Sequence, residues 1–400
     1  MTSIRQALLG PSYYRHRHLI EQSKTWSADR VQSYTSERLA RLTRRYGDQV
    51  TMKEDYRQHL DRYTRWDVPP LTHPVRTSGT SGQMLRLQAD TFARRQKERA
   101  YLFDIWSRAG FRPHDLRIRY RGDMRHGVAP YYDRLENVWV ISPAATTEPE
   151  LGKLRSWLRT QPPFFLHVYP SSLFSLIDLI GEDLFRSLPV RGVLAGSEAF
   201  PIAEQQQFER DFGIKIAHWY GHSEYVTLAY CCRDCHGFHF YPTYGRVDLL
   251  PSDTEGCRRI VGSSYNWIGT QFVRYDTGDL AVAAGRECAA DNFPRAAAIV
   301  GRVQETFVDM SGRRRSLFDY AFSDLDHDSF FDLIKDVQFV QKEPGALQVR
   351  VVPSPGADRA KIQQVFAANM TLTTLEFEFV PSIERSQSGK RRYFVNAMTS

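Results

Sequence analysis

Short apolar runs alternate with helical segments over residues 138–221. The runs are VWVIS, FFLHVYP, RGVLAG and IKIAHWYG, and segments such as SSLFSLIDLIGEDLF and IAEQQQFERDF lie between them. This strand–helix–strand repetition predicts parallel strands that are joined by crossover helices. Ligands of such sheets bind beyond the carboxyl ends of the strands. We therefore predict an α/β protein whose functional residues follow its strands.

The segments before and after this region predict helices upstream and a second, smaller domain downstream. Upstream, ADRVQSYTSERLARLTRRYG and TFARRQKERAYLFDIWSRAG have the apolar spacing of helices. Downstream, IVGRVQETFVD reads as a strand, DHDSFFDLIKDV as a helix, VQFVQKEPGALQVRVVP as a hairpin, DRAKIQQVFAANM as a helix and TLEFEFVPSI as a strand. We predict a large domain of sheets flanked by helices over residues 1–302 and a small α+β domain over residues 303–400.

Size and composition agree with a globular protein of more than one domain. The chain has 400 residues, of which 42% are hydrophobic and 25% charged, and this length favours a large domain with a smaller one. No apolar stretch approaches the roughly 18 residues that cross a bilayer. The N-terminal sequence MTSIRQALLGPSYYRHRH lacks the apolar core of a secretory signal. We expect a cytoplasmic protein with no integral membrane segment.

The formal charge of +7 has two interpretations. Arginine-rich stretches at residues 313–315 and 385–392 fit contact with nucleic acid, an anionic membrane surface or a phosphorylated substrate. They fit an ordinary solvated surface equally well. Aromatic residues are not interleaved with the basic ones, and no named nucleic-acid-binding motif occurs. We therefore expect no nucleic-acid partner.

The segment RTSGTSGQ, at residues 76–83, consists mostly of hydroxyl residues and glycines. Glycines let a backbone approach a ligand closely, and successive N–H groups can then converge on phosphate oxygens. A loop of this composition is also typical of a flexible connection. The segment alone therefore leaves both interpretations open.

Five more short motifs follow this loop in a fixed order. They are GSE at residues 196–198, YGHSE at 220–224, YDTGD at 275–279, GR at 301–302 and SGK at 388–390. With this series, the chain from about Leu71 to its end resembles the adenylate-forming superfamily of acyl- and aryl-CoA ligases. It is most similar to the phenylacetate–CoA ligase branch and its relatives in capsular polysaccharide biosynthesis.

The resemblance implies a binding site for ATP that is spread along the chain. Ser197 and Glu198 would border the adenine, and the ring of Tyr220 would stack on it. Asp279 would accept hydrogen bonds from the ribose hydroxyl groups. The residues that would bind the β- and γ-phosphates are Thr77, Ser78, Gly79, Thr80, Ser81 and Gly82.

The resemblance also implies the residues that act at the reacting phosphate. Ser223 would contact the α-phosphate beside Gly221, and Glu224 would hold Mg²⁺, which prefers carboxylate oxygen. Lys390 would bridge the substrate carboxylate and the α-phosphate and offset the negative charge of the transition state. Arg302 would support the ribose from the hinge between the domains.

Two positions depart from the usual pattern of the superfamily. Gln83 stands where a lysine often follows the phosphate loop, which implies one weaker phosphate contact. Gln304 stands where an acidic residue often follows the hinge arginine. Members of the superfamily rotate a mobile small domain about this hinge between adenylation and acyl transfer, so Gln304 makes the second half-reaction the less secure prediction.

Four aromatic residues flank the predicted strand ends and are candidates for the acid pocket: His167, Tyr169, His218 and Trp219. The small first region of the chain leaves few residues with which to shape a large acyl tunnel. We therefore expect an aromatic or small polar carboxylic acid as the substrate.

The five cysteines argue against a disulfide framework, because their number is odd and three of them cluster at residues 231–235. The segment CCRDCHGFH combines thiols and imidazoles at spacings that suit tetrahedral zinc. The phenylacetate–CoA ligase branch often carries Cys and His here and another Cys after its TGD motif. We therefore expect a structural zinc bound by three or four of Cys232, Cys235, His239 and Cys288, with Cys231 as an alternative to Cys232 and His236 as an alternative to His239.

Three classes of function fit these residues. The first is a ligase that uses Mg·ATP to form an acyl adenylate and passes the acyl group to a thiol of CoA or of a carrier protein. The second passes the acyl group to an amine or a hydroxyl group in polysaccharide or natural-product biosynthesis. The third is a non-catalytic nucleotide-binding relative. The presence of Glu224, Asp279 and Lys390 together argues against the third class.

Overall fold

The structure is a computed structural model. It describes residues 9–65, 72–76, 86–90, 93–120, 129–142, 147–198, 200, 202–252, 257–265, 269–284, 288–300, 306–312, 314–317, 321, 333–383 and 394–398. The predicted phosphate loop at residues 77–82 lies outside this part of the chain, as do Arg302 and Lys390.

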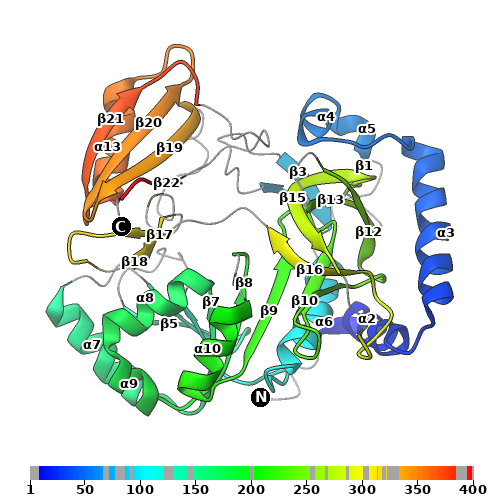
Figure 1. Cartoon of the computed structure of the whole chain (residues 1–400), viewed down its shortest axis with the longest axis horizontal. Helices are drawn as coiled ribbons and strands as arrows, with labels where there is room; N and C mark the ends of the chain where they lie inside the picture. The colour runs from blue at the N-terminus through cyan, green and yellow to red at the C-terminus, as the bar shows by residue number, and fades with distance from the viewer. Residues whose placement is uncertain are drawn as a thin grey trace.

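A long mixed sheet forms the centre of the protein (Figure 1). Its parallel strands are β4 (Arg117–Tyr120), β6 (Val138–Ile141), β7 (Phe164–Val168), β8 (Val190–Gly196) and β9 (Ile216–Gly221). Its antiparallel strands are β5 (Tyr131–Asp133), β10 (Leu228–Cys231), β11 (Phe238–Phe240), β12 (Gly245–Pro251), β13 (Cys257–Ser264), β15 (Tyr275–Ala283) and β16 (Arg295–Val300). In the described part, the strand order is β12-β13-β15-β16-β11-β10-β9-β8-β7-β4-β6-β5. The predicted parallel strands with crossover helices are therefore confirmed.

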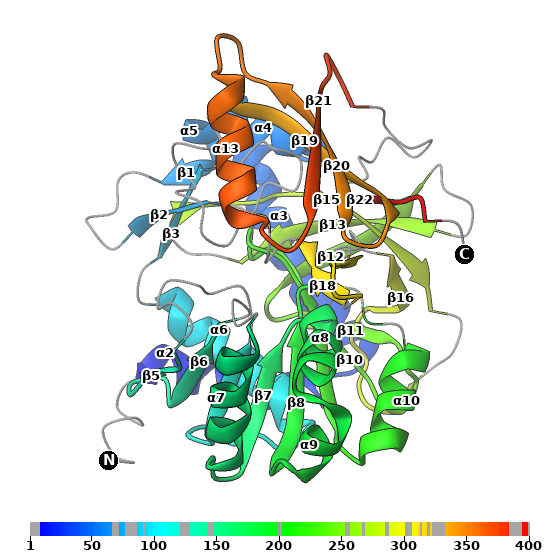
Figure 2. The same ribbon diagram turned by 90° about the vertical axis from the view of Figure 1, so that its left-hand side faces the viewer.

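Helices cover both faces of the parallel strands. On one face lie α7 (Glu148–Arg159), α8 (Pro170–Ile180), α9 (Glu182–Ser187) and α10 (Ile202–Phe212), and Figure 2 shows them in front of the strands. On the other face lie α2 (Gly10–Ser23) and α6 (Ala93–Ser107). Successive strand residues alternate between the two faces. Leu166 packs among the α8-side residues, for example, whereas Phe165 packs on the α6 side.

The remaining upstream helices are α3 (Ala28–Tyr46), α4 (Lys53–Gln58) and α5 (Leu60–Tyr63). The upstream strands β1 (Thr64–Arg65), β2 (Thr72–Arg76) and β3 (Arg86–Asp90) form a small sheet with β14 (Gly269–Thr270), in the order β1-β14-β3-β2. Ser27 caps the start of α3, because its hydroxyl group accepts a hydrogen bond from the Arg30 amide, and Gly47, with φ 94°, caps the end. Strands β2 and β3 are antiparallel, and Arg76 pairs with Arg86. The predicted phosphate loop therefore belongs to the connection between two paired strands.

The C-terminal part has its own sheet and core. Strands β19 (Ile334–Glu343), β20 (Ala346–Pro353), β21 (Thr374–Phe379) and β22 (Phe394–Asn396) form the sheet, and α13 (Arg359–Asn369) packs on it. The predicted hairpin, the helix after it and the last strand are confirmed. The helix predicted over DHDSFFDLIKDV is wrong for its last four residues, 334–337, which begin β19, because they pair with β20 in a sheet. The rest of that segment lies outside the described residues, except Leu333.

The C-terminal part lies above the carboxyl ends of the parallel strands (Figures 1 and 2). A hairpin of β17 (Thr306–Val308) and β18 (Arg314–Ser316) leads into it, and β18 packs against α8. The predicted boundary after residue 302 is itself outside the described part, so the exact division into domains stays a prediction. None of the described helices is long and apolar enough to cross a membrane.

Candidate nucleotide site and candidate metal centre

The side chains of Tyr220 and Asp279 meet, although they come from two strands of the large sheet that are not neighbours. The Tyr220 hydroxyl group donates a hydrogen bond of 2.8 Å to Asp279 Oδ2. Tyr220 is on β9 and Asp279 on β15, and three strands lie between these two in the sheet order. In a flat sheet, four strand spacings would separate them by about 19 Å. The sheet therefore has to curl to bring together the two residues that the resemblance assigns to adenine and ribose.

The TGD motif bulges out of β15. The pairing of β13 with β15 shifts around Gly278, whose φ of 74° is readily adopted only by glycine. The Gly278 amide donates a hydrogen bond to Asp276 Oδ1, and Arg259 holds the other oxygen of that carboxylate at 2.8 Å. The Thr277 hydroxyl group accepts from the Asp279 amide. The bulge thus fixes the backbone from which Asp279 projects.

Glu224 lies in the loop after β9 and is buried. Its carboxylate is 3.5 Å from the Tyr275 hydroxyl group and 3.3 Å from His222 Nδ1. His222 Nε2 in turn lies 3.4 Å from the Thr227 hydroxyl group. A buried carboxylate with these neighbours fits the predicted Mg²⁺ ligand, because hard divalent cations prefer carboxylate oxygen.

The GSE motif forms a sharp turn after β8. Ser197 is exposed with φ 72°, and Glu198 is buried. A Cβ atom at Gly196 would lie 2.2 Å from the Trp219 indole, so only glycine fits beneath that ring. The motif therefore has a packing reason for its glycine in addition to the proposed adenine contact.

Two of the four predicted pocket residues face each other on the α6 side of the sheet. His167 and Trp219 have ring centroids 5.9 Å apart, and Trp106 of α6 contacts both at 5.1 and 6.0 Å. All three rings are buried. Tyr169 is half-buried at the start of α8.

His218 points to the opposite face from Trp219. Its Nε2 lies 3.1 Å from the Glu198 carbonyl oxygen, and its Nδ1 lies 3.2 Å from the Gln205 side-chain amide nitrogen. Burial lowers the pKa of His218 to about 4 despite the hydrogen bond to the Glu198 carbonyl. The structure therefore places a neutral histidine in the core beside α10, away from His167 and Trp219.

Two further predicted site residues, Gly221 and Ser223, lie between Tyr220 and Glu224 in the sequence. Gly221 ends β9, and Ser223 is half-buried in the loop that follows. The roles assigned to residues 77–82, Arg302 and Lys390 concern residues outside the described part and stay predictions.

A second group of side chains converges beside β10 and β11. One potential ligand atom from each of Cys232, Cys235, His239 and Cys288 lies within 4.8 Å of every other. Cys232 Sγ and Cys288 Sγ are 3.8 Å apart, and Cys235 Sγ is 3.2 Å from His239 Nε2. Zn–S bonds of about 2.3 Å at tetrahedral angles give sulfur–sulfur distances of about 3.8 Å, whereas a disulfide requires about 2.05 Å. This donor set therefore fits zinc.

The structure separates the alternatives that the sequence leaves open. Cys231 lies on the other face of β10, where burial raises the pKa of its thiol to about 12. His236 is exposed and contacts Gln206. At Cys232, burial disfavours the thiolate, but hydrogen bonds from His239 and from the backbone of Cys235 and Asp234 lower the pKa of this thiol. Cys232 is therefore suited to bind a metal as the thiolate.

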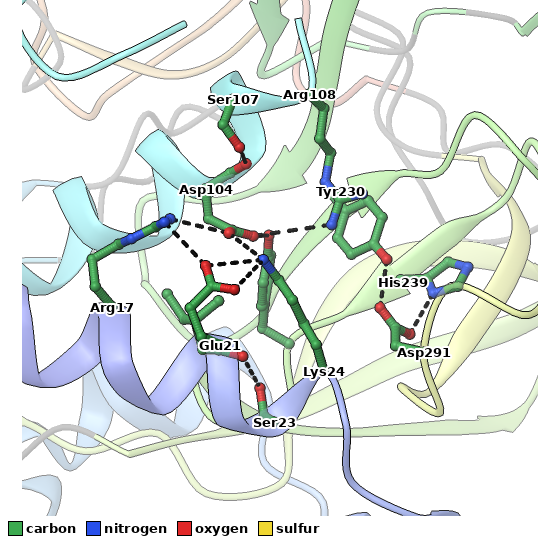
Figure 3. Close-up of polar contacts among 12 residues, drawn as sticks. Arg17, Glu21, Ser23, Lys24, Asp104, Ser107, Arg108, Tyr230, His239 and Asp291 are labelled. Atoms are coloured by element: carbon green, nitrogen blue, oxygen red, sulfur yellow. Dashed lines mark hydrogen bonds and ion pairs between the residues drawn. The ribbon is translucent and has the colours of Figure 1, made fainter. Parts of the chain in front are cut away.

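Asp291 contacts His239 through the ring nitrogen that does not face the cysteines. Its Oδ1 is 2.7 Å from His239 Nδ1 (Figure 3). This contact leaves His239 Nε2 free to lie 3.2 Å from Cys235 Sγ. The Tyr230 hydroxyl group donates a hydrogen bond of 2.5 Å to Asp291 Oδ2, and the Phe293 amide donates to Oδ1. Histidine ligands of metals commonly donate their second N–H to a carboxylate in this way.

Comparison with known proteins places the fold. No protein-family model matches the chain, and no curated protein sequence matches it. The structure of 2-hydroxyisobutyryl-CoA ligase in complex with 2-HIB-AMP and CoA matches 99% of this chain and 90% of its own length, with 16% identity and a TM-score of 0.50. The chain has the fold of an acyl-CoA ligase. At this level of identity the likeness concerns the fold alone.

Two weaker likenesses involve related enzymes. The amide bond synthetase McbA from Marinactinospora thermotolerans is 14% identical, with 81% of this chain and 68% of that chain covered and a TM-score of 0.43. Malonyl-CoA ligase, in a complex with methylmalonyl-CoA and AMP, is 14% identical, with 78% and 71% covered and a TM-score of 0.42. Neither match is close enough to carry an argument. The resemblance to the phenylacetate–CoA ligase branch stays a prediction.

Sequence reasoning missed three residues that complete these sites. Trp106 is one of many apolar residues on α6, so no pattern singles it out. Tyr230 reads as an ordinary strand residue. Asp291 follows Cys288 by three positions, and an acidic residue close to a candidate histidine- and cysteine-containing metal site is a usable signal for a carboxylate behind a histidine ligand.

Proposed function

We propose that the chain activates a carboxylic acid with Mg·ATP as an acyl adenylate and then transfers the acyl group to a thiol, acting in the cytoplasm. The observation that carries this proposal is the meeting of Tyr220 and Asp279, with Glu224 close by in sequence, on the fold of an acyl-CoA ligase. Of the three residues, Tyr220 supplies an aromatic face and the others supply carboxylates. A purine, a ribose and a hydrated divalent cation need these groups.

The chemistry takes place in two steps. A carboxylate oxygen of the acid attacks the α-phosphorus of ATP, and pyrophosphate leaves. The thiol of CoA or of a carrier protein then loses its proton and attacks the acyl carbon, and AMP leaves. Glu224 would hold the Mg²⁺ that neutralises the phosphates, and Lys390 would stabilise the negative charge at the α-phosphate.

The acid is proposed to be small. Trp106, His167 and Trp219 contact one another behind the carboxyl ends of β7 and β9, and all three are buried. A long acyl chain that entered here would have to displace two tryptophan side chains from a packed core. His167 adds one polar edge to this group of rings. The arrangement therefore favours a short acid, or one with a polar substituent.

We also assign a structural zinc to Cys232, Cys235, His239 and Cys288. The fit of their ligand atoms to tetrahedral geometry supports this assignment. Four protein ligands would fill a tetrahedral coordination sphere, as in structural zinc sites. Zinc would therefore contribute to folding rather than to adenylation.

Pyrophosphate exchange tests the proposed function directly. The full-length protein is incubated with ATP, Mg²⁺, labelled pyrophosphate and each member of a panel of short aliphatic, hydroxy and aromatic acids. We expect acid-dependent exchange that Lys390→Ala abolishes and that Lys361→Ala, an exposed lysine on α13, preserves. Tight ATP binding without exchange for any acid would instead indicate a non-catalytic nucleotide-binding protein.

The acceptor is identified in a second stage. An acid that supports exchange is incubated with ATP and, separately, with CoA, a pantetheine-bearing carrier protein and a panel of amines. Formation of a thioester supports the proposal. Formation of an amide or ester without any thioester would assign the chain to the class that acylates amines or hydroxyl groups.

A further inference from the structure

The carboxylate behind His239 belongs to a chain of contacts that leaves the metal centre. The Tyr230 ring, whose hydroxyl group donates to Asp291, stacks on His239 with centroids 5.0 Å apart. On its other side, the Arg108 guanidinium lies over the same ring at 3.3 Å from the centroid. Figure 3 shows these groups in order from His239 to the end of α6. His239 and Asp291 are 0% and 1% exposed, so this contact is shielded from water.

The chain continues to the N-terminal helix. Arg108 Nη2 is 4.0 Å from Asp104 Oδ2, and the Asp104 side chain is 1% exposed. Two cations bind the other oxygen of that carboxylate: Lys24, which caps the end of α2, at 2.6 Å, and Arg17 of α2 at 3.1 Å. The Tyr241 hydroxyl group donates to Asp104 Oδ2 at 2.6 Å. A buried carboxylate shared in this way ties the end of α2 to α6, because a charge in the core has to be paired and hydrogen-bonded.

A second route starts beside Asp291. The Asn292 side-chain amide donates a hydrogen bond of 2.8 Å to the carbonyl oxygen of Trp26, in the connection between α2 and α3. Residues 288–292 therefore contribute a metal ligand, the carboxylate behind another ligand and a contact with the N-terminal helices. Immobilising this short segment at Cys288 and Asp291 also immobilises Asn292.

We propose that Asp291 positions His239 for the metal ion. Through Asp291 and its neighbour Asn292, metal binding also holds the connection between α2 and α3 against the large sheet. This inference rests on the zinc assignment but not on the adenylation chemistry. Metal binding restrains His239 and Cys288. Asp291, which contacts His239, in turn restrains Tyr230 through their hydrogen bond. Asn292, the next residue, restrains Trp26 in the same way. Carboxylates behind metal ligands typically change metal affinity by 10–100-fold when they are removed.

Zinc affinity tests the positioning role. We expect Asp291→Ala to weaken Zn²⁺ binding 10–100-fold in competition with a chromogenic chelator, and Asp291→Asn to weaken it less, because an amide oxygen can still accept from His239. The matched control is Asp234→Ala, which removes an exposed carboxylate next to Cys235. Unchanged affinity in Asp291→Ala would overturn the positioning role.

Hydrogen exchange of the full-length protein tests the fastening. Chelating the metal should increase exchange at residues 20–30 as well as in β10 and β11, and should leave α13 unchanged. Asn292→Ala should increase exchange at residues 20–30 while Zn²⁺ affinity stays normal, so this variant also reports if Asp291→Ala fails to fold. Loss of protection in β10 and β11 alone, with residues 20–30 unchanged on chelation, would overturn the proposal. Loss of pyrophosphate exchange in any of these samples has no bearing on it.

Discussion

The hydroxyl group of Tyr220 lies 2.8 Å from a carboxylate oxygen of Asp279, although the two residues belong to strands that three others separate. The hydrogen bond fixes how the Asp279 carboxylate is oriented and how the Tyr220 ring is tilted. The proposed adenine and ribose contacts are therefore set together before ATP arrives. Such pre-organisation lowers the entropic cost of binding.

The first prediction separates the two contributions of Tyr220. Tyr220→Phe keeps the ring and removes the hydroxyl group, so we expect the KM for ATP in pyrophosphate exchange to rise by about 3–10-fold, as for loss of one hydrogen bond. Asp279→Ala removes the proposed acceptor for the ribose and should cost about 10–100-fold in kcat/KM, as for a hydrogen bond to a charged group.

The double variant and a distant tyrosine provide the controls. If the two residues act as one unit, Tyr220→Phe should have little further effect in an Asp279→Ala background. Tyr131→Phe changes an exposed tyrosine of β5 and should leave the KM for ATP unaltered. Full additivity of the two changes would mean that the hydrogen bond does not organise the site.

The second prediction concerns the size of the acid. Trp219→Ala removes an indole from the cluster that also contains Trp106 and His167. We expect the preferred acid in pyrophosphate exchange to become longer by several carbon atoms, while the KM for ATP changes little. Phe200→Ala, which removes an equally buried ring from the α8 face of the sheet, is the control for general loosening of the core. The same chain-length preference in wild type and Trp219→Ala would exclude this cluster as the end of the pocket.

Much of the large domain follows from local sequence patterns. Apolar runs bounded by helical segments predict β7, β8 and β9, because parallel strands are buried on both faces. The same period of two predicts that His218 and Trp219 point to opposite faces, so they do not both line one pocket. The strand at residues 334–337 could not be predicted in this way, because the apolar spacing there fits a helix as well as a strand. Only the pairing with β20 selects the strand.

The sites depend on long-range geometry to different degrees. Cys232, Cys235 and His239 are close in sequence, so their convergence is predictable from spacing. Cys288 is distant in sequence and was predicted only from the family resemblance, and the structure brings it to the other three. The contact between Tyr220 and Asp279 requires a curled sheet, which no local pattern encodes. Asp291 and Arg108 lie far apart in the sequence. Asp291 contacts the Tyr230 hydroxyl group and Arg108 lies over the Tyr230 ring, so only the assembled fold reveals the path between them.

The third prediction concerns the metal. Elemental analysis of the purified protein should give one zinc ion per chain, and Cys235→Ser should lose it together with several degrees of thermal stability, because structural zinc contributes to folding. Cys257→Ser is the matched control, since Cys257 starts β13 outside the cluster. Equal zinc content in both variants would contradict the assignment.

The fourth prediction is a loss of stability in mild acid that depends on His218. Burial lowers the pKa of His218 to about 4 in the folded chain, against about 6.5 when it is unfolded. Between these values the unfolded chain binds the proton more tightly, so the free energy of unfolding falls as the pH falls from 6.5 to 4, by about 3 kcal/mol at most.

His218→Gln can still donate to the Glu198 carbonyl but does not titrate, so it should lack this component. Urea unfolding at several pH values measures the difference in unfolding free energy between wild type and variant, which cancels the losses of stability common to both. His18→Gln, an exposed histidine on α2, should leave the wild-type slope intact, and an unchanged slope in His218→Gln would show that another group causes the acid sensitivity.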